Sequence, residues 1–546
     1  MPTLSDLPDL SRLLRLAMGR DPQHEGDPAT WAIIDLHGAY PTRHGLAAVQ
    51  SVVGRTESIE SLGERLDKLA EMDTVKAVLV RVVGLTAGLA TSEAIGRLLG
   101  RLQQHKRVVV YLPQVNMRSL LVSAEVREVV APESAEVMLA GFAAERVYYG
   151  EFLTRRGIGF ENLRIREYKS ALTRFSEDHM DDFDREQLTA YIDSAERAWR
   201  RAVSRAEAVP ERTDDWPEAG FTNADQLLAA GLVTRIAYDD EIAVPVDQGW
   251  EAALQVVRTQ LAGKRRAKKE PGIAVVPVVG AIVSGRSRPA SPVNSQTAGS
   301  ETVVAALRKA ERDEHTEAIL LHVDSGGGSA LASDVICRAV ARCTKPVVAV
   351  MGEVAASGGY YVLSQADHVV ASPFTITGSI GVVVGKPVLS GLNERIGRNP
   401  QTVGREMALF GSPNRPFSDD ERAWAERMMD EVYARFVARV AEGRSLDPDR
   451  VNEIGRGRIW SGADAQERGL VDELGDLQTG IAAARRLAEL PEDAPVRPVS
   501  AGFAVPGVPT FGKDPAAALA TVAMQSLWPF GEELVLTWFD SGVTIR

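Results

Sequence analysis

The sequence predicts an α/β fold made of two duplicated domains, each with a parallel sheet flanked by helices. Two observations predict this fold class. Short, almost continuously apolar segments alternate with amphipathic segments, which is the pattern of parallel strands buried between helices. The same order of segments then occurs a second time in the chain of 546 residues. A chain of this length exceeds what one hydrophobic core usually supports, so two homologous domains are the simplest explanation.

Four pairs of matching segments define the two copies. They are Thr30–Gly38 with Ile273–Gly280, Val75–Val82 with Thr316–Val323, Lys106–Leu112 with Lys345–Met351, and Phe221–Asp225 with Trp460–Asp464. We therefore expect an N-terminal extension (1–28), a first domain (29–257), a basic linker (258–272), a second domain (273–492) and a C-terminal tail (493–546).

Within the second copy, strands and helices are expected to alternate. The strands are predicted at Ile273–Val283, Ala318–Val323, Val347–Met351 and His368–Ala371, and the helices at Val303–Arg312, Ala330–Arg342 and near Ile481–Leu490. A long amphipathic helix is predicted late in each copy, over Arg185–Ala208 and Asp419–Glu442.

Ser357 is the candidate nucleophile. It stands between a predicted strand and a short apolar helix, and Gly358 and Gly359 follow it. A serine at the first turn of a helix faces free backbone N–H groups and the positive end of the helix dipole, which favour a developing oxyanion. An ordinary N-cap serine, followed by glycines that allow tight packing, would give the same local pattern. This segment alone leaves both interpretations open.

The two copies differ where chemistry would take place. Opposite Ser357 the first copy has Met117 or Arg118, and no pair of glycines follows. In the other direction, Lys169 of the first copy has no lysine counterpart at Arg405–Phe410 of the second. A serine in one copy and a lysine in the other predict one active site divided between the two copies.

A serine and a lysine are sufficient for nucleophilic catalysis. The serine hydroxyl needs a base, and lysine is a base only when it is neutral. Burial lowers the pKa of a lysine, and a site closed between two domains would supply that burial. None of the eight histidines has a motif that ties it to Ser357, which disfavours a Ser-His-Asp arrangement. The alternative for Lys169 is a solvated lysine at the start of a helix.

Taken together, the motifs resemble a known family. They are Tyr168–Ala171, Asp324-Ser325 with the glycines that follow, Ala356–Tyr360, Thr377–Gly381 and Ser461–Asp472. In this order, over nearly the whole chain, they resemble the long two-domain form of signal peptide peptidase A, also called protease IV. The resemblance implies tandem ClpP/crotonase-like α/β domains. It also implies that Ser357 is the nucleophile, that Lys169 is the general base and that the Ser379 hydroxyl holds the lysine amine in place.

An oxyanion hole is expected from two backbone N–H groups. Gly327, in the glycine loop, and Gly358, directly after the nucleophile, are the candidate donors. The chain has Ser325-Gly326 where the family usually has Ser-Pro, and the missing proline is expected to loosen this loop.

The resemblance implies a serine peptidase that hydrolyses unfolded or membrane-derived peptides, such as cleaved signal peptides. It implies a homo-oligomer, a tetramer in this family, and neither a metal nor another cofactor. Two rival functions remain: a crotonase-like acyl-CoA enzyme, which shares the glycine loop, and a non-catalytic scaffold that retains the fold.

Composition narrows the partners and the location. A net charge of −12 argues against nucleic acid as the main partner. The two cysteines, Cys337 and Cys343, are six residues apart on a predicted helix, so a disulfide between them is not expected. Neither a signal peptide nor an apolar run of about eighteen residues is seen. Membrane association is thus expected only from the resemblance, and a cytoplasmic or peripheral location stays open.

Overall fold

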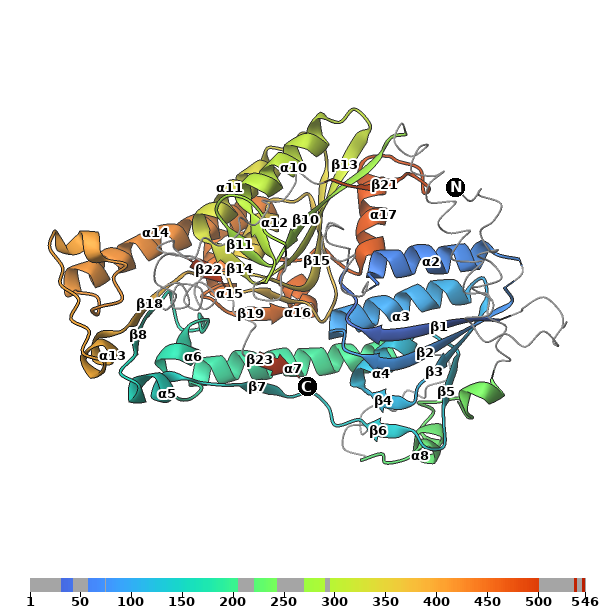
Figure 1. The fold of residues 1–546 in the computed structure, drawn as a ribbon. Helices are drawn as coiled ribbons and strands as arrows, with labels where there is room; N and C mark the ends of the chain where they lie inside the picture. The colour runs from blue at the N-terminus through green and yellow to red at the C-terminus, as the bar shows by residue number, and fades with distance from the viewer. Residues whose placement is uncertain are drawn as a thin grey trace, which may run out of the picture.

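The structure is a computed structural model, which describes residues 31–42, 57–73, 75–204, 220–242, 270–289, 295–499, 535–537 and 543–545. Two α/β halves lie against each other, and they correspond to the two copies in the sequence (Figure 1). The expected N-terminal extension, residues 258–269 of the expected linker and most of the expected tail lie outside the described residues.

The first repeat contains a parallel sheet of five strands in the order β1-β2-β3-β5-β9. The strands are β1 (Trp31–Gly38), β2 (Ala77–Leu85), β3 (Arg107–Tyr111), β5 (Glu128–Ala131) and β9 (Arg235–Ile236). Helices α2 (Ile59–Glu71) and α3 (Leu89–Gln103) run beside each other along this sheet (Figure 1). Both helices bury one apolar face, as their amphipathic pattern requires.

The second repeat is built on a sheet in the order β19-β17-β15-β13-β10-β21. Its strands are β10 (Gly272–Val279), β13 (Thr316–Ser325), β15 (Val347–Ala356), β17 (Ile376–Gly378), β19 (Ile459–Ser461) and β21 (Val496–Pro498). Strand β15 is longer than predicted. Its first half pairs with β16 (His368–Ala371), which in turn pairs with β20 (Glu473–Leu474), and its last residues pair with β17. Ser357 follows directly at the end of this divided strand.

One predicted strand is wrong. The segment Ile273–Val283 is two strands, because β10 ends at Val279 and β11 (Ala281–Val283) belongs to a different sheet. The break lies at Gly280, whose φ is +82°, and a Cβ there would stand 2.0 Å from the Gln296 carbonyl oxygen. Only glycine tolerates both conditions, and its apolar neighbours on each side conceal the turn in the sequence.

A third sheet joins the two repeats. Its order is β12-β11-β14-β22-β18-β8, with β12 (Thr297–Gly299), β14 (Gly327–Ser329), β22 (Val535–Thr537), β18 (Val383–Val388) and β8 (Gly159–Arg164). Strand β8 of the first repeat pairs antiparallel with β18 of the second along six residues. The first repeat therefore extends an arm into the second, and this arm leads to Lys169.

The repeats also share hydrophobic core. The core cluster of the first repeat includes Val354, Ala356, Phe374, Ile376 and Ile459 of the second. These five residues come from β15, β17, β19 and the connection between them, beside the position of Ser357. The two repeats are thus packed together at the strands that carry the candidate nucleophile.

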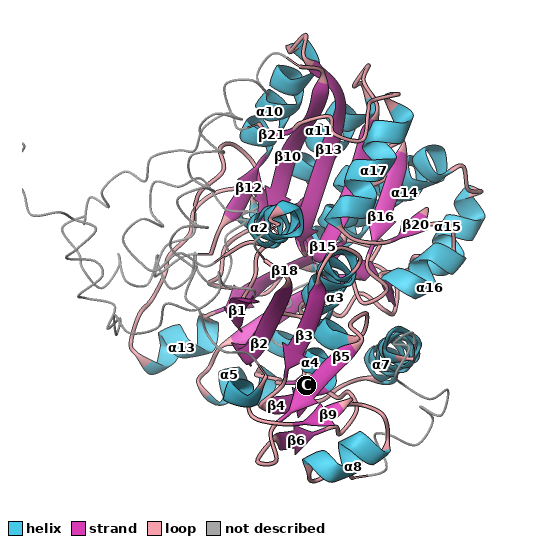
Figure 2. Cartoon of the chain, turned by 90° about the vertical axis from the view of Figure 1, so that its right-hand side faces the viewer, coloured by secondary structure: helices cyan, strands magenta, loops and turns pink. Residues whose placement is uncertain are grey.

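The remaining described helices, drawn in cyan in Figure 2, include all of those predicted from the sequence and several short ones that were not predicted. They are α4 (Met117–Ser123), α5 (Gly150–Arg155), α6 (Thr173–Ser176), α7 (Asp182–Val203), α8 (Ala224–Ala229), α10 (Ser300–Arg312), α11 (Ala330–Ala341), α12 (Gly358–Leu363), α13 (Ser390–Arg395), α14 (Asp419–Arg444), α15 (Pro448–Ile454), α16 (Gly462–Glu467) and α17 (Leu477–Leu487). The two long helices, α7 and α14, lie where they were predicted.

Three further observations complete the description of the fold. Among the described helices, none combines the length and the apolar character needed to cross a membrane. Cys337 and Cys343 are both free, as expected. Two short pairs complete the described strands: β4 (Gln114–Asn116) pairs with β6 (Glu136–Met138), and β7 (Ala144–Arg146) pairs with β23 (Val543–Ile545).

Candidate active site

Ser357 occupies a strained turn between β15 and α12. Its φ is +54°, its side chain is fully buried, and its N–H donates to the Gly378 carbonyl at 2.8 Å. A residue other than glycine at positive φ costs free energy, and such residues cluster at functional sites. The hydroxyl of Ser357 makes no capping hydrogen bond to its own helix. This geometry counts against an ordinary N-cap serine.

The glycines around Ser357 are needed for close packing. A Cβ at Gly359 would stand 2.2 Å from the Ser325 carbonyl oxygen, so the helix α12 approaches the glycine loop too closely for any side chain. Gly358 is the first residue of α12, where a backbone N–H has no partner within the helix. The N–H of Gly327 donates to Ser325 Oγ at 3.1 Å, so its use as an oxyanion donor requires that bond to open or to be shared.

The structure brings Lys169 to Ser357 from the opposite repeat. Lys169 Nζ lies 2.6 Å from Ser357 Oγ, 2.9 Å from the Ser379 carbonyl oxygen and 3.0 Å from Ser379 Oγ. The ammonium form of lysine has three N–H donors, and these three contacts can use all of them. A neutral amine, with two N–H groups and one lone pair, fits the same contacts if it donates twice to Ser379 and accepts from the Ser357 hydroxyl. The three distances suit both protonation states, so the surroundings of the amine decide between them.

The surroundings of Lys169 favour the neutral form. The side chain is 1% exposed, and burial lowers its pKa well below the usual value of 10.5. Desolvation penalises the charged form, and among the described residues no carboxylate contributes an opposing effect on this pKa. The alternative of a solvated lysine at a helix start is therefore wrong for this residue, which lies in a buried segment between β8 and α6.

Ser379 has an unusual backbone of its own. Its φ is +51°, and its N–H donates to the Arg458 carbonyl at 2.7 Å, on the segment that leads into β19. This conformation directs both the carbonyl and the hydroxyl of Ser379 to Lys169 Nζ. The sequence predicted only the contact between the Ser379 hydroxyl and Lys169. The contact between the Ser379 carbonyl and Lys169 was not predicted.

A glycine that sequence reasoning missed makes room for Lys169. Gly457 has φ +82°, and a Cβ there would stand 2.6 Å from both the backbone nitrogen and the Cβ of Lys169. Sequence reasoning also missed Arg146, Asp184 and Gln187, which surround the backbone of the lysine segment. These four residues carry no motif, and only the fold brings them to the site.

Comparison with known proteins assigns the family. A sequence model of peptidase family S49 matches this chain twice, at residues 100–252 and 339–491. The chain belongs to peptidase family S49. The two matches fall one in each repeat, in agreement with the expected tandem ClpP-like α/β organisation.

Individual relatives extend the similarity over most of the chain. "Serine protease SPPA, chloroplastic" of Arabidopsis thaliana is 30% identical over 80% of this chain and 66% of its own length. "Protease 4" of Haemophilus influenzae is 27% identical over 72% of this chain and 67% of its own length. The chain thus aligns with about two thirds of each relative. Among solved structures, a ClpP1 mutant from Listeria monocytogenes is 14% identical with a TM-score of 0.24, over 38% of this chain and 94% of that one.

Proposed function

We propose that this chain is a serine endopeptidase with Ser357 as the nucleophile and Lys169 as the general base. The observation that carries the proposal is the 2.6 Å contact between Lys169 Nζ and Ser357 Oγ. Both residues are buried, and burial lowers the pKa of the lysine, which favours the neutral form that can accept a proton. Membership of a peptidase family supports the same reaction.

In the proposed mechanism, Lys169 accepts the hydroxyl proton while Ser357 Oγ attacks the carbonyl carbon of the scissile peptide bond. The oxyanion that forms accepts hydrogen bonds from the N–H of Gly358 and, after the glycine loop adjusts, of Gly327. The protonated lysine, held by Ser379, then gives its proton to the leaving amine as the C–N bond breaks. Water releases the acyl group by the reverse sequence, with Lys169 again as the base.

The neighbouring sheet supports a peptide substrate. Strand β22 pairs antiparallel with β14 on one side and with β18 on the other. It also contacts α12, the helix that begins directly after Ser357. The position beside α12 is thus filled by an extended segment of the chain itself, β22, held by main-chain pairing. We infer that a peptide substrate binds near the nucleophile in the same extended form, as in peptide recognition by strand addition. Such contacts are independent of sequence and suit unfolded peptides.

Substrate source, assembly and location follow from the resemblance and belong to the proposal. We infer that the peptides include membrane-derived ones such as cleaved signal peptides. A relative from Enterococcus faecium, 34% identical over 32% of this chain, carries the name "Putative signal peptide peptidase SppA". We also infer a homo-oligomer, with a tetramer expected from the family, and a peripheral association with the membrane.

The test is turnover of a fluorogenic apolar peptide by the wild type, Ser357→Ala and Lys169→Ala. Loss of turnover in both variants, together with labelling of the wild type by a serine-reactive phosphonate, would support the proposal. Turnover that survives either substitution would contradict the Ser/Lys dyad. Binding of coenzyme A without phosphonate labelling would instead favour an acyl-CoA enzyme.

A further inference from the structure

Lys169 lies on a segment without regular secondary structure, between β8 and the short helix α6. The backbone of such a segment is fixed only if other groups hold it. Catalytic geometry tolerates little movement, since a displacement of about 1 Å can lower the rate about 10²-fold. The groups that hold the peptide units on either side of Lys169 therefore bear directly on the proposed reaction.

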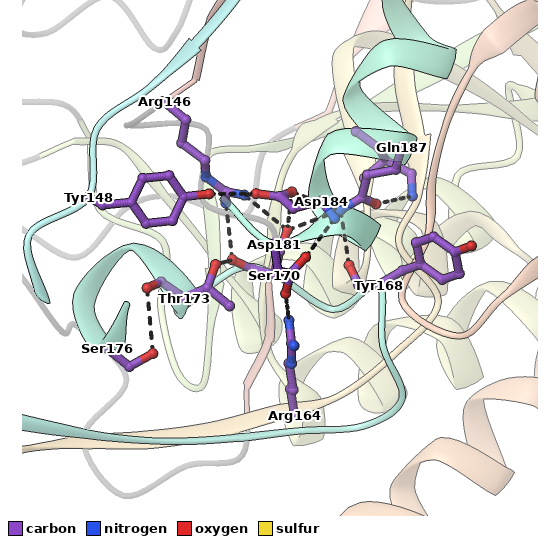
Figure 3. Close-up of polar contacts among 11 residues, drawn as sticks. Arg146, Tyr148, Arg164, Tyr168, Ser170, Thr173, Ser176, Asp181, Asp184 and Gln187 are labelled. Carbon is purple, nitrogen blue, oxygen red and sulfur yellow. Dashed lines mark hydrogen bonds and ion pairs between the residues drawn. The ribbon is translucent and has the colours of Figure 1, made fainter. Parts of the chain in front are cut away.

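Gln187, on α7, holds both neighbours of Lys169 (Figure 3). Its Nε2 donates to the Tyr168 carbonyl at 3.1 Å and to Ser170 Oγ at 3.1 Å. The side chain of Gln187 is almost fully buried, so these bonds do not compete with bulk water. One amide group thus fixes the residue before Lys169 and the residue after it.

A buried ion pair holds Ser170 from the other side. Arg146 and Asp184 are paired, and their side chains are only 1% and 2% exposed. Arg146 donates to the Ser170 carbonyl at 3.1 Å and to Ser170 Oγ at 3.0 Å. Asp184 accepts hydrogen bonds from Ser170 Oγ and from the Tyr148 hydroxyl, each at 2.8 Å. Every polar atom of the Ser170 side chain and its carbonyl therefore has a fixed partner.

The pairing with Arg146 also keeps negative charge from Lys169. A carboxylate in contact with the lysine would stabilise its protonated form and remove the base. Asp184 instead faces Arg146, Ser170 and Tyr148, and burial alone sets the low pKa of Lys169. The network thus holds the lysine segment without charging the lysine.

Gln187 connects this network to the second repeat. Its Oε1 accepts a hydrogen bond from the Ile459 N–H at 3.2 Å. Ile459 lies on β19, opposite Gly378 of β17, and the next residue after Gly378 is Ser379. Ser379 is the acceptor of both N–H donations from Lys169. A single side chain therefore links the backbone that carries the base to the strand pair that carries its acceptor.

We propose that Gln187 and the Arg146–Asp184 pair are positioning residues for the proposed reaction. They fix the peptide units flanking Lys169 and tie them to β19, so that Nζ meets Ser357 Oγ across the boundary between the repeats. This inference rests on the proposed peptidase function, and none of the three residues touches the reacting atoms.

The test compares Gln187→Met with Tyr191→Phe. Both residues lie on α7 one turn apart, both are buried, and each makes a hydrogen bond to the backbone of the second repeat. Tyr191 donates to the Phe374 carbonyl at 2.9 Å. The Tyr191→Phe variant therefore removes a hydrogen bond between the repeats that the lysine segment does not take part in.

For Gln187→Met, we expect kcat on the fluorogenic peptide to fall about 10²-fold, with KM changed less than about twofold. Tyr191→Phe should keep kcat within about twofold of the wild type, even if its melting temperature falls as much as that of Gln187→Met. Equal losses of kcat in the two variants, or an unchanged kcat in Gln187→Met, would overturn the inference. An inactive wild type would overturn the proposed function, and this inference with it.

Ser170→Ala provides a second variant if Gln187→Met does not fold. It deletes one small hydroxyl, while the Arg146–Asp184 ion pair and the bond from Gln187 to the Tyr168 carbonyl can remain. We expect the same fall in kcat at nearly constant KM, and Ser170→Thr should restore part of it. A folded Ser170→Ala with the kcat of the wild type would overturn the inference.

Discussion

The same strand, turn and helix occur once in each repeat, with opposite use of the residue at the turn. In the first repeat, the residue directly before α4 is Asn116, rather than the Met117 or Arg118 that the sequence comparison set opposite Ser357. Asn116 has φ −141°, and its side chain accepts hydrogen bonds from the N–H groups of Arg118 and Ser119. In the second repeat, Ser357 precedes α12 with φ +54° and makes no capping bond. One polar side chain stabilises its own helix, and the other is left available to Lys169. The comparison teaches that strain and a missing cap, not the residue type alone, distinguish the candidate nucleophile.

The candidate nucleophile lies in the second repeat, whereas the candidate base, Lys169, lies in the first. In the first repeat, Lys169 is buried and contacts the second repeat through its amine. The corresponding segment of the second repeat, Arg405–Phe410, contains a 3-10 helix at Glu406–Leu409 in which no residue is buried. Each repeat has therefore retained one half of the proposed dyad, and four predictions test this division.

The largest expected effect comes from Lys169→Arg. Arginine keeps N–H donors at this position, but it cannot lose its proton in a protein and so cannot act as a base. We expect kcat/KM to fall about 10⁴-fold, the upper range for loss of a general base. Lys386→Arg is the matched control, because Lys386 is also buried and donates to a backbone carbonyl, that of Phe410 at 2.9 Å. Substantial activity in Lys169→Arg would show that this lysine is not the base.

Gly457→Ala should give the next largest effect. The new Cβ would meet the backbone of Lys169, so the lysine has to move, and we expect kcat to fall about 10²-fold. Gly469→Ala is the control for backbone strain. Its φ of +76° is similar to the +82° of Gly457, but its nearest neighbour is the Leu446 side chain at 3.4 Å. Equal kcat in the two variants would mean that Gly457 does not set the lysine position.

Below the pKa of Lys169, kcat/KM should fall about tenfold for each unit by which the pH decreases. The pKa of Lys169 is lowered by burial, and the base is active only when neutral. Protonation below that pKa removes the base, so log kcat/KM should fall with a slope of one as the pH decreases, and level off above the pKa. The profile is measured at constant ionic strength. A profile that is flat on the acidic side, or that rises there, would contradict a neutral lysine base.

The smallest effect on turnover is expected from a substitution at the turn before α4 in the first repeat. Asn116→Ala removes the cap of α4 and should lower the free energy of unfolding by about 1 kcal/mol. It should leave kcat within about twofold. Ser357→Ala should do the opposite, with activity lost and no cap removed. Denaturant unfolding and peptide turnover on the same preparations measure both quantities. A loss of turnover in Asn116→Ala would break the contrast between the repeats.

The sequence predicted the parts of the fold that depend on local pattern. Strand β16 and the start of α14 lie where the apolar periodicity placed them, and the duplication was visible as matched segments. The break at Gly280 was not predicted, because both of its flanks are apolar and only the close approach of Gln296 explains it. Strand β8 was also not predicted, since its partner β18 lies in the other repeat.

The residues of the candidate site were likewise predicted only in part. Ser357 and Lys169 were predicted from a local motif and from differences between the copies, and Ser379 was predicted from the family resemblance. The structure places the three together. The structure does not test the role of Gly327 and Gly358 as oxyanion donors, so that role stays a prediction. The supporting residues Arg146, Asp184 and Gln187 were not predicted. Their role depends on long-range contacts with Ser170. Arg146 on β7 and Asp184 on α7 pair in the interior, and the sequence pattern around each is the same as around a solvated residue.

The arm formed by β8 also has a consequence for synthesis of the chain. Lys169 and Ser357 are 188 residues apart in sequence, and β19, to which Gln187 bonds, follows later still. Translation delivers the N-terminal half first. A ribosome-bound chain therefore carries the lysine long before the serine, and the serine before the strand that completes its surroundings. If Ser357 and Lys169 act together as proposed, an unfinished copy has no assembled dyad, and it cannot cut itself or its neighbours before the second repeat has folded.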